Sequence, residues 1–169
     1  DQSDPEPRGR RQHRHISGTL PLMPIEILNQ TGKRMVLAPI RLALEAGLQD
    51  LQREEAGLQV VILANEEMRS LNRETRQVDA ETDVLSFPAP NLPGFENWLG
   101  EIAISIDFAR AQATIRKVRV VDELAMLAIH GLLHLAGFDD EQDGARAQMV
   151  DRQNRILASV NLPTDADWH

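Results

Sequence analysis

Two histidines at helical spacing are the residues of this sequence that are best placed to do chemistry. Of the five histidines, two lie near the N-terminus and one is the last residue, which leaves His130 and His134 for a folded core. Residues four apart share one face of an α-helix, so their imidazoles can bind one ion at about 2.0–2.1 Å each. The residues around them are mostly leucine, and burying an imidazole without a partner costs roughly 1–3 kcal/mol. A metal ion would supply the partner; the alternative is a pair of ordinary histidines bonded to backbone or solvent.

A third ligand follows where the chain is expected to reverse. Gly137 comes three residues after His134, where a residue with left-handed backbone can end the helix and turn the chain back. Asp140 can then return to the same ion. Two histidines and one carboxylate leave a fourth position for water, which is the arrangement of catalytic zinc. Alone, Gly137 would be a helix stop and Asp140 a solvated acid; with the histidines, they predict a metal site of His130, His134 and Asp140.

The same spacing is close to that of the metzincin-like metalloproteases. Those enzymes carry a glutamate directly after the first histidine, and it acts as the general base. Here this position is Gly131, which has no side chain and cannot accept a proton from metal-bound water. A metalloprotease is therefore the least favoured reading of the site.

The elements that position this site are predicted from hydrophobic periodicity and from capping and helix-ending residues. Strands are expected at 25–28, 58–64, 83–87 and 99–106, and helices at 33–46, from 65, 107 to about 117, 121–136 and about 144–158. Asn65 and Asp107 are expected to cap their helices, and Gly47 to end the first helix. The order of elements predicts an α+β fold, in which a small mixed four-stranded sheet is covered by about five helices and the metal site lies on a central helix.

Length and composition favour one domain with a polar extension. Residues 1–23 are expected to form a disordered basic and polar tail, and residues 24–169 a single domain. The sequence contains no cysteine, which removes disulfides and thiolate ligands and fits a cytoplasmic protein. No apolar run reaches the roughly 18 residues that a membrane span requires.

The net charge of −8 argues against loose binding to nucleic acid, because contact with phosphates is mainly electrostatic. A nucleic-acid partner would need a local basic patch. Four basic residues before the long helix could form one, although a solvated helix end is the favoured alternative: Arg110, Arg116, Lys117 and Arg119.

Three blocks of this sequence resemble the YbeY family of bacterial endoribonucleases and rRNA maturation factors. His130–Asp139 resembles the family signature H-G-x-L-H-L-x-G-Y-D-H, and Leu99–Ser105 resembles its L-G-D/E-I-x-I strand. Leu71–Pro88 resembles L-N-x-x-Y-R followed by D-x-x-T-D-V-L-S-F-P. The resemblance extends over roughly residues 24–158. It implies a small sheet with helices and a cleft that holds the metal.

The resemblance also implies a function. The protein is expected to be a zinc-dependent hydrolase of phosphodiester bonds, an endoribonuclease specific for single strands. It would mature the 3′ end of 16S rRNA and act in ribosome quality control in the cytoplasm. Its partners would be single-stranded RNA, rRNA and the small ribosomal subunit, with neither DNA nor a membrane expected. The alternative function is a ribosome-associated assembly factor whose metal is structural and whose cleavage activity is weak.

The sequence departs from the family pattern at three positions. Asp140 stands where the family has its third metal histidine, and Phe138 and Thr75 stand in place of tyrosines. A carboxylate is a competent zinc ligand. Its side chain is shorter than that of histidine, and it adds a negative charge close to an anionic substrate.

Arg76 matches the cleft arginine of the family. A guanidinium group matches phosphate oxygens bidentately, so Arg76 is the expected phosphate clamp and substrate-binding residue. The alternative is a surface salt bridge with Glu74 or Asp79. We therefore expect one zinc ion on His130, His134 and Asp140, with Arg76 and His130 as the catalytic residues.

Overall fold

The computed structural model describes residues 25–165. The predicted tail, residues 1–23, lies outside this range and stays a prediction. The elements follow in the order β1 (Ile25–Asn29), α1 (Ala38–Asp50), β2 (Gly57–Leu63), α2 (Asn65–Arg76), β3 (Val84–Pro88), β4 (Trp98–Ser105), α3 (Ile106–Arg116), α4 (Val120–Leu135) and α5 (Asp143–Ser159). Within the described range, no helix combines the length and the apolarity needed to cross a bilayer.

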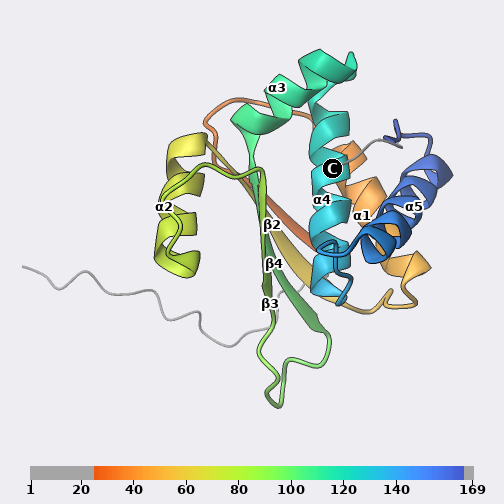
Figure 1. The fold of residues 1–169 in the computed structure, drawn as a ribbon. Coiled ribbons are helices and arrows are strands. Elements are labelled where there is room, and N and C mark those ends of the chain that lie inside the picture. The colour runs from red at the N-terminus through yellow and green to blue at the C-terminus, as the bar shows by residue number, and fades with distance from the viewer. Residues whose placement is uncertain (1–24, 166–169) are drawn as a thin grey trace, which may run out of the picture.

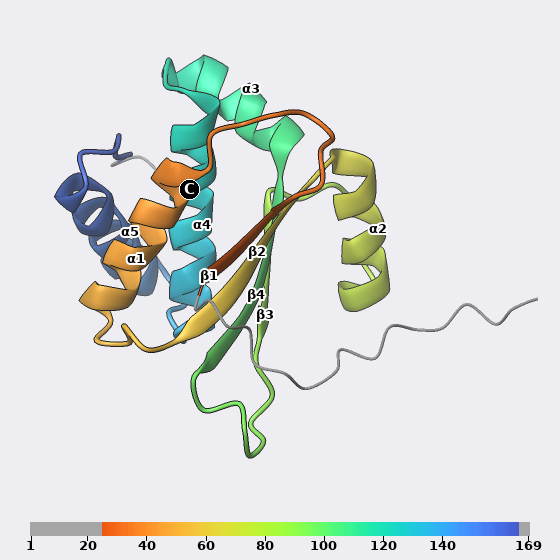
Figure 2. The ribbon, with the colours of Figure 1, turned by 180° about the vertical axis from the view of Figure 1, so that it is seen from behind.

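The strands form one mixed sheet in the order β1-β2-β4-β3. β1, β2 and β4 are parallel, and β3 is the antiparallel edge strand beside β4. α1, α4 and α5 cover one face of the sheet, whereas α2 lies on the opposite side (Figures 1 and 2). The predicted α+β class, with a four-stranded mixed sheet and five helices in the described part, is confirmed.

The helix that carries both histidines, α4, is the centre of the core. Every residue from Asp122 to Leu133 is buried, which is the pattern of a helix with neighbours on all sides. Two glycines allow these neighbours to approach closely. A Cβ at Gly47 on α1 would lie 2.6 Å from Cδ2 of Leu132, and one at Gly131 on α4 would lie 2.6 Å from Cγ2 of Ile102 on β4.

The first helix differs from its prediction at both ends. α1 begins at Ala38 rather than at Lys33, and Pro39 lies in its first turn, where the missing N–H costs nothing. The helix also continues through Gly47 to Asp50. Gly47 is therefore wrong as a helix end; its role is the close contact with α4.

The predicted caps of α2 and α3 are also wrong, because Asp107 accepts from the start of α2 and Ser105 caps α3. Asn65 is the first residue of α2, and its backbone N–H donates to Oδ2 of Asp107 at 2.7 Å. Ser105 caps α3 by accepting a hydrogen bond from the N–H of Phe108, while its hydroxyl donates to Oδ1 of Asn65 at 2.5 Å. Asp107, predicted to cap α3, thus serves α2.

Candidate metal centre

His130, His134 and Asp140 come together at the end of α4. The histidines lie in the last turns of the helix, and Asp140 lies in the loop that follows. Gly137 has a φ of +95°, which is the left-handed region, and its N–H donates to the carbonyl of His134. This reversal, predicted from the glycine, brings the loop back over the helix end.

The three donor atoms are spaced as ligands of one ion are spaced. Nε2 of His130 lies 3.1 Å from Nε2 of His134, and Oδ2 of Asp140 lies 3.4 Å from the first and 3.6 Å from the second. Ligands about 2.0–2.1 Å from a tetrahedral ion are separated by about 3.3–3.4 Å. The observed distances bracket that value, so the group could hold a metal ion, and its two nitrogens and one oxygen suit zinc.

Hydrogen bonds on the far side of each ring direct the Nε2 atoms to this point. Nδ1 of His130 lies 3.2 Å from Oε1 of Gln153, and Nδ1 of His134 lies 3.1 Å from the carbonyl oxygen of Phe138. Both oxygens are acceptors, so each Nδ1 carries the proton and donates. Each Nε2 then directs a lone pair toward the position shared with Asp140.

The site is buried on one side and open on the other. Burial of the ring, together with the neighbouring His134, lowers the pKa of His130 below its ordinary value, although Asp140 acts in the opposite direction. A lowered pKa favours the neutral imidazole, the form that binds metal. The side chains of His134 and Asp140 are 30% and 37% exposed, against 8% for His130, so a ligand can approach from their side.

Gly131, the residue after the first histidine, faces the sheet and not the three donor atoms. A side chain at Gly131 would meet Ile102 and Ser86 rather than the three donor atoms. Its carbonyl oxygen accepts a hydrogen bond from the hydroxyl of Ser86 at 3.1 Å, which ties α4 to the edge strand β3. Close packing around Gly131 therefore leaves no room for the glutamate that serves as general base in the metalloproteases.

Arg76 lies across β3 from the metal centre, at the end of α2. Its Nη2 donates to the carbonyl oxygen of Ser86 at 3.3 Å, and the hydroxyl of the same serine contacts Gly131. The alternative salt bridge with Asp79 is not formed, because Asp79 pairs with Arg69 at 2.8 Å. Within residues 25–165, no carboxylate forms an ion pair with Arg76, so its charge remains available.

The basic patch considered before α4 is not available as a patch. Arg116 is half-buried and pairs with Glu123, and its Nε also lies 3.3 Å from Oδ2 of Asp165. Arg119 pairs with Asp122 at 2.7 Å. Two of the four basic side chains are thus paired with neighbouring acids, which leaves too little free charge in this region for a basic patch.

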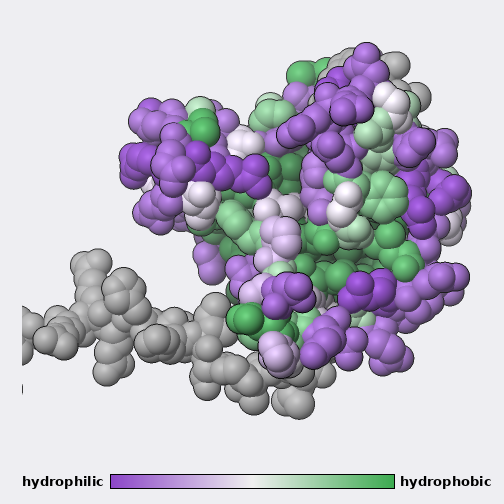
Figure 3. All heavy atoms as spheres, turned by 60° about the horizontal axis from the view of Figure 1, so that its bottom comes forward, coloured by the Kyte–Doolittle hydropathy of each residue, from purple (hydrophilic) through white to green (hydrophobic). Residues whose placement is uncertain are grey.

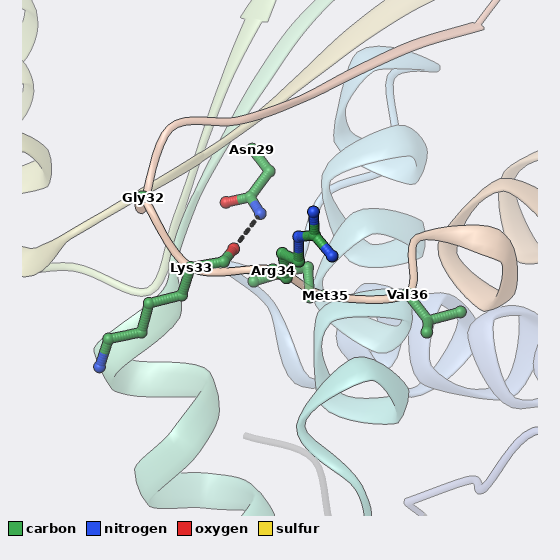
Figure 4. A pocket seen from close by; sticks show the side chains of 6 residues that line it. All are labelled: Asn29, Gly32, Lys33, Arg34, Met35 and Val36. Atoms are coloured by element: carbon green, nitrogen blue, oxygen red, sulfur yellow. Dashed lines mark hydrogen bonds between the residues drawn. The ribbon is translucent and has the colours of Figure 1, made fainter.

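Two hollows were not predicted from the sequence. A groove of about 410 Å³ lies between α2 and the exposed face of the sheet, with Leu71, Thr75 and Phe87 in its lining. The view in Figure 3 shows α2 as a polar lobe, with apolar side chains between this lobe and the body. The other hollow, of about 600 Å³, lies in the loop between β1 and α1. Its two cations, Lys33 and Arg34, point away from each other and do not converge on a ligand (Figure 4).

Gln153 was also missed, although the sequence contains a signal for it. The buried residues of α5 are Met149, Gln153, Ile156 and Leu157, which lie on one stripe of the helix. A single amide on an otherwise apolar stripe requires a buried partner. Here the partner is His130.

The fold and the site together define an α+β protein in which two histidines and a carboxylate that could hold a metal ion meet at the end of the central helix. A family model described as "Endoribonuclease YbeY" matches residues 27–161, and the chain belongs to this family. The resemblance predicted from the three sequence blocks is thereby confirmed.

Individual relatives agree with the family model. The chain is 39% identical over 144 residues to the endoribonuclease YbeY of Sulfurovum sp. (strain NBC37-1), covering 83% of this chain and 92% of that protein. It is 37% identical over 123 residues to that of Anaeromyxobacter dehalogenans (strain 2CP-C), covering 73% of this chain but only 64% of the relative. The solution structure of TM1509 from Thermotoga maritima is similar in fold, with a TM-score of 0.59, 27% identity, and coverage of 80% of this chain and 88% of that one.

Proposed function

We propose that this protein is an endoribonuclease that cleaves single-stranded RNA with one zinc ion held by His130, His134 and Asp140. The observation that carries the proposal is the convergence of two Nε2 atoms and one carboxylate oxygen, 3.1–3.6 Å apart, at a position open to solvent on one side. The relatives named above are endoribonucleases, which gives the reaction its class.

In this proposal, the metal-binding residues act at the phosphate group that is cleaved, and Arg76 binds phosphate charge. A zinc ion held by these three residues would supply a Lewis acid for a phosphoryl oxygen and would lower the pKa of bound water toward about 7. His130 and His134 hold their lone pairs on that position, and the exposed side of Asp140 leaves room for a phosphate. Arg76 neutralises phosphate charge through its bidentate donors, and the carbonyl of Ser86 keeps its guanidinium beside β3.

Family membership supports rRNA as the biological substrate. We assign the protein to maturation of the 3′ end of 16S rRNA and to ribosome quality control, with the small ribosomal subunit as partner and the cytoplasm as location. Because the folded body is acidic, recognition must depend on local contacts such as Arg76 rather than on overall charge.

A second candidate is favoured by one observation, the carboxylate at position 140. Asp140 places a negative charge where an anionic strand must approach, and this would weaken cleavage more than metal binding. Under this second reading, the protein is an assembly factor with a structural metal.

Two assays separate the candidates. Purified protein is incubated with labelled single-stranded RNA and with a matched duplex, with and without a chelator, and His130→Ala is run in parallel. The enzyme reading expects cleavage of the single strand only, lost on chelation, restored by zinc and absent in His130→Ala. The assembly reading expects no cleavage, together with binding to small ribosomal subunits. Cleavage that survives both chelation and His130→Ala would refute the proposed mechanism.

A further inference from the structure

Helix α5 contributes none of the three proposed ligands, yet its side chains contact His130, Asp140 and Phe138, the residue that hydrogen-bonds to His134. Gln153 accepts the hydrogen bond from Nδ1 of His130. The guanidinium of Arg152 lies 5.2 Å above the ring of Phe138, whose carbonyl oxygen accepts from Nδ1 of His134. Arg146 donates through Nε to the carbonyl oxygen of Asp140 at 3.0 Å.

Of these contacts, the one made by Gln153 is the most informative, because the amide lies in an unfavourable place. Its side chain is fully buried on the apolar stripe of α5. Its Nε2 has no hydrogen-bond partner among the described residues. Burying an amide with an unpaired donor destabilises a fold, and a leucine or methionine would fill the same space without that cost. A fold that needed only packing here would gain nothing from glutamine.

The direction of the amide decides what it does to His130. With Oε1 toward the ring, Nδ1 must carry the proton and Nε2 presents a lone pair to the metal position. With the amide reversed, its N–H₂ would face Nδ1, the proton would move to Nε2, and that proton would point at His134 and Asp140. Only the first arrangement is compatible with a bound cation.

We infer that Gln153 is a positioning residue, which holds the Nδ1-protonated tautomer of His130 and so prepares the Nε2 atom for the metal. This inference rests on the metal-binding part of the proposed function and not on cleavage of RNA. It extends the site to α5, a helix that contributes no ligand.

Two substitutions distinguish this role from packing. Gln153→Met keeps the volume and removes the acceptor; Gln153→Glu keeps the acceptor. We expect Gln153→Met to lower zinc affinity about 10–100-fold, the usual effect of losing the hydrogen-bond partner of a ligating histidine. We expect its metal-free thermal midpoint to change little, because the removal of the unpaired Nε2 donor of Gln153 offsets the loss of the partner of Nδ1 of His130. Gln153→Glu should bind zinc at least as tightly as the wild type.

Ile156→Val is the matched control on the same buried stripe. It removes the terminal Cδ1 methyl group of a buried side chain whose Cγ2 lies near Gly47 of α1, and it changes no hydrogen-bonding group. We expect it to lower the thermal midpoint while zinc affinity stays within about twofold of wild type. The two variants should therefore change stability and affinity in different ways, which a general loss of packing would not produce.

The tautomer can be observed directly in metal-free wild-type protein by two-bond ¹H–¹⁵N correlation spectroscopy of the histidine rings. We expect His130 to carry its proton on Nδ1, and to lose this preference in Gln153→Met. A proton on Nε2 in the wild type, or undiminished zinc affinity of Gln153→Met, would overturn the inference. Zinc binding without RNA cleavage would refute only the proposed function, whereas a wild type that binds no zinc would refute both.

Discussion

The close approach of α4 to β4 at Gly131 gives the sharpest test of how the metal centre is supported. A Cβ here would lie 2.6 Å from Cγ2 of Ile102, and 3.2 Å from both its Cδ1 and Oγ of Ser86. Ordinary contact begins at 3.4 Å. The nearest pair in Gly131→Ala therefore needs about 0.8 Å more room, in a core that is already close-packed.

The neighbouring side chain cannot supply this space by rotating. Ile102 is β-branched and fully buried, so its Cγ2 position is fixed by a stiff χ1. The strain must separate α4 from the sheet. Overpacking of this kind costs about 1–3 kcal/mol of unfolding free energy. It also moves the helix that carries His130 relative to Arg76, and a displacement near 1 Å at a catalytic site can cost about 10²-fold in rate.

The assays are denaturant unfolding, zinc titration and cleavage of single-stranded RNA, with two glycine controls. A Cβ at Gly47 also meets an atom at 2.6 Å, but this is the end of the Leu132 side chain and lies on the opposite side of α4. Gly47→Ala should lose stability and keep most of its activity. A Cβ at Gly144, in the first turn of α5, meets nothing within 4 Å, so Gly144→Ala should be neutral or stabilise by at most about 0.5–1 kcal/mol. Wild-type stability and activity in Gly131→Ala would refute the reasoning.

Three further predictions follow from the same geometry. Asp140→His should keep or raise zinc content and Asp140→Ala should lower it, measured by elemental analysis; unchanged content in Asp140→Ala would remove this residue from the ligands. Arg76→Ala should reduce kcat/KM for RNA about 10–100-fold, from the loss of charge-assisted hydrogen bonds, at constant zinc content. Because burial lowers the pKa of His130, the unfolded chain binds a proton below about pH 6.5 that the folded, metal-free protein resists. The free energy of unfolding, measured by urea denaturation, should therefore decrease as the pH falls from 7.5 to 5.5. An equally steep pH dependence in His130→Ala would contradict this.

Local pattern was sufficient to predict much of this fold. The β-branched run that became β2 and the apolar stretch of α4 were placed to within one residue at most ends. The convergence of these three side chains was predictable because three short-range facts determine it: the helical spacing of His130 and His134, a glycine that permits the reversal, and an acid that follows.

The errors occurred where residues far apart in sequence decide the outcome. A glycine such as Gly47 is typical of a helix end, but here it lies inside α1, where the side chain of Leu132 leaves no room for a Cβ. Asp107 looks like the cap of its own helix, but its carboxylate reaches the start of α2. Gln153 is 23 residues from its histidine. The stripe of α5 indicates that Gln153 needs a buried partner, but local pattern identifies neither that partner nor the contacts of Gly47 and Asp107, which only the packed structure reveals.

The place of α5 in the chain has a consequence for the order in which the protein matures. All three ligands precede this helix, so during synthesis they leave the ribosome before the segment that orients them. A nascent chain that ends at Glu141 holds every donor atom and lacks Arg146, Arg152 and Gln153. If α5 orients these side chains as we infer, the group acquires its binding geometry only after residues 143–159 have been made, and a nascent chain without them does not present a formed metal site.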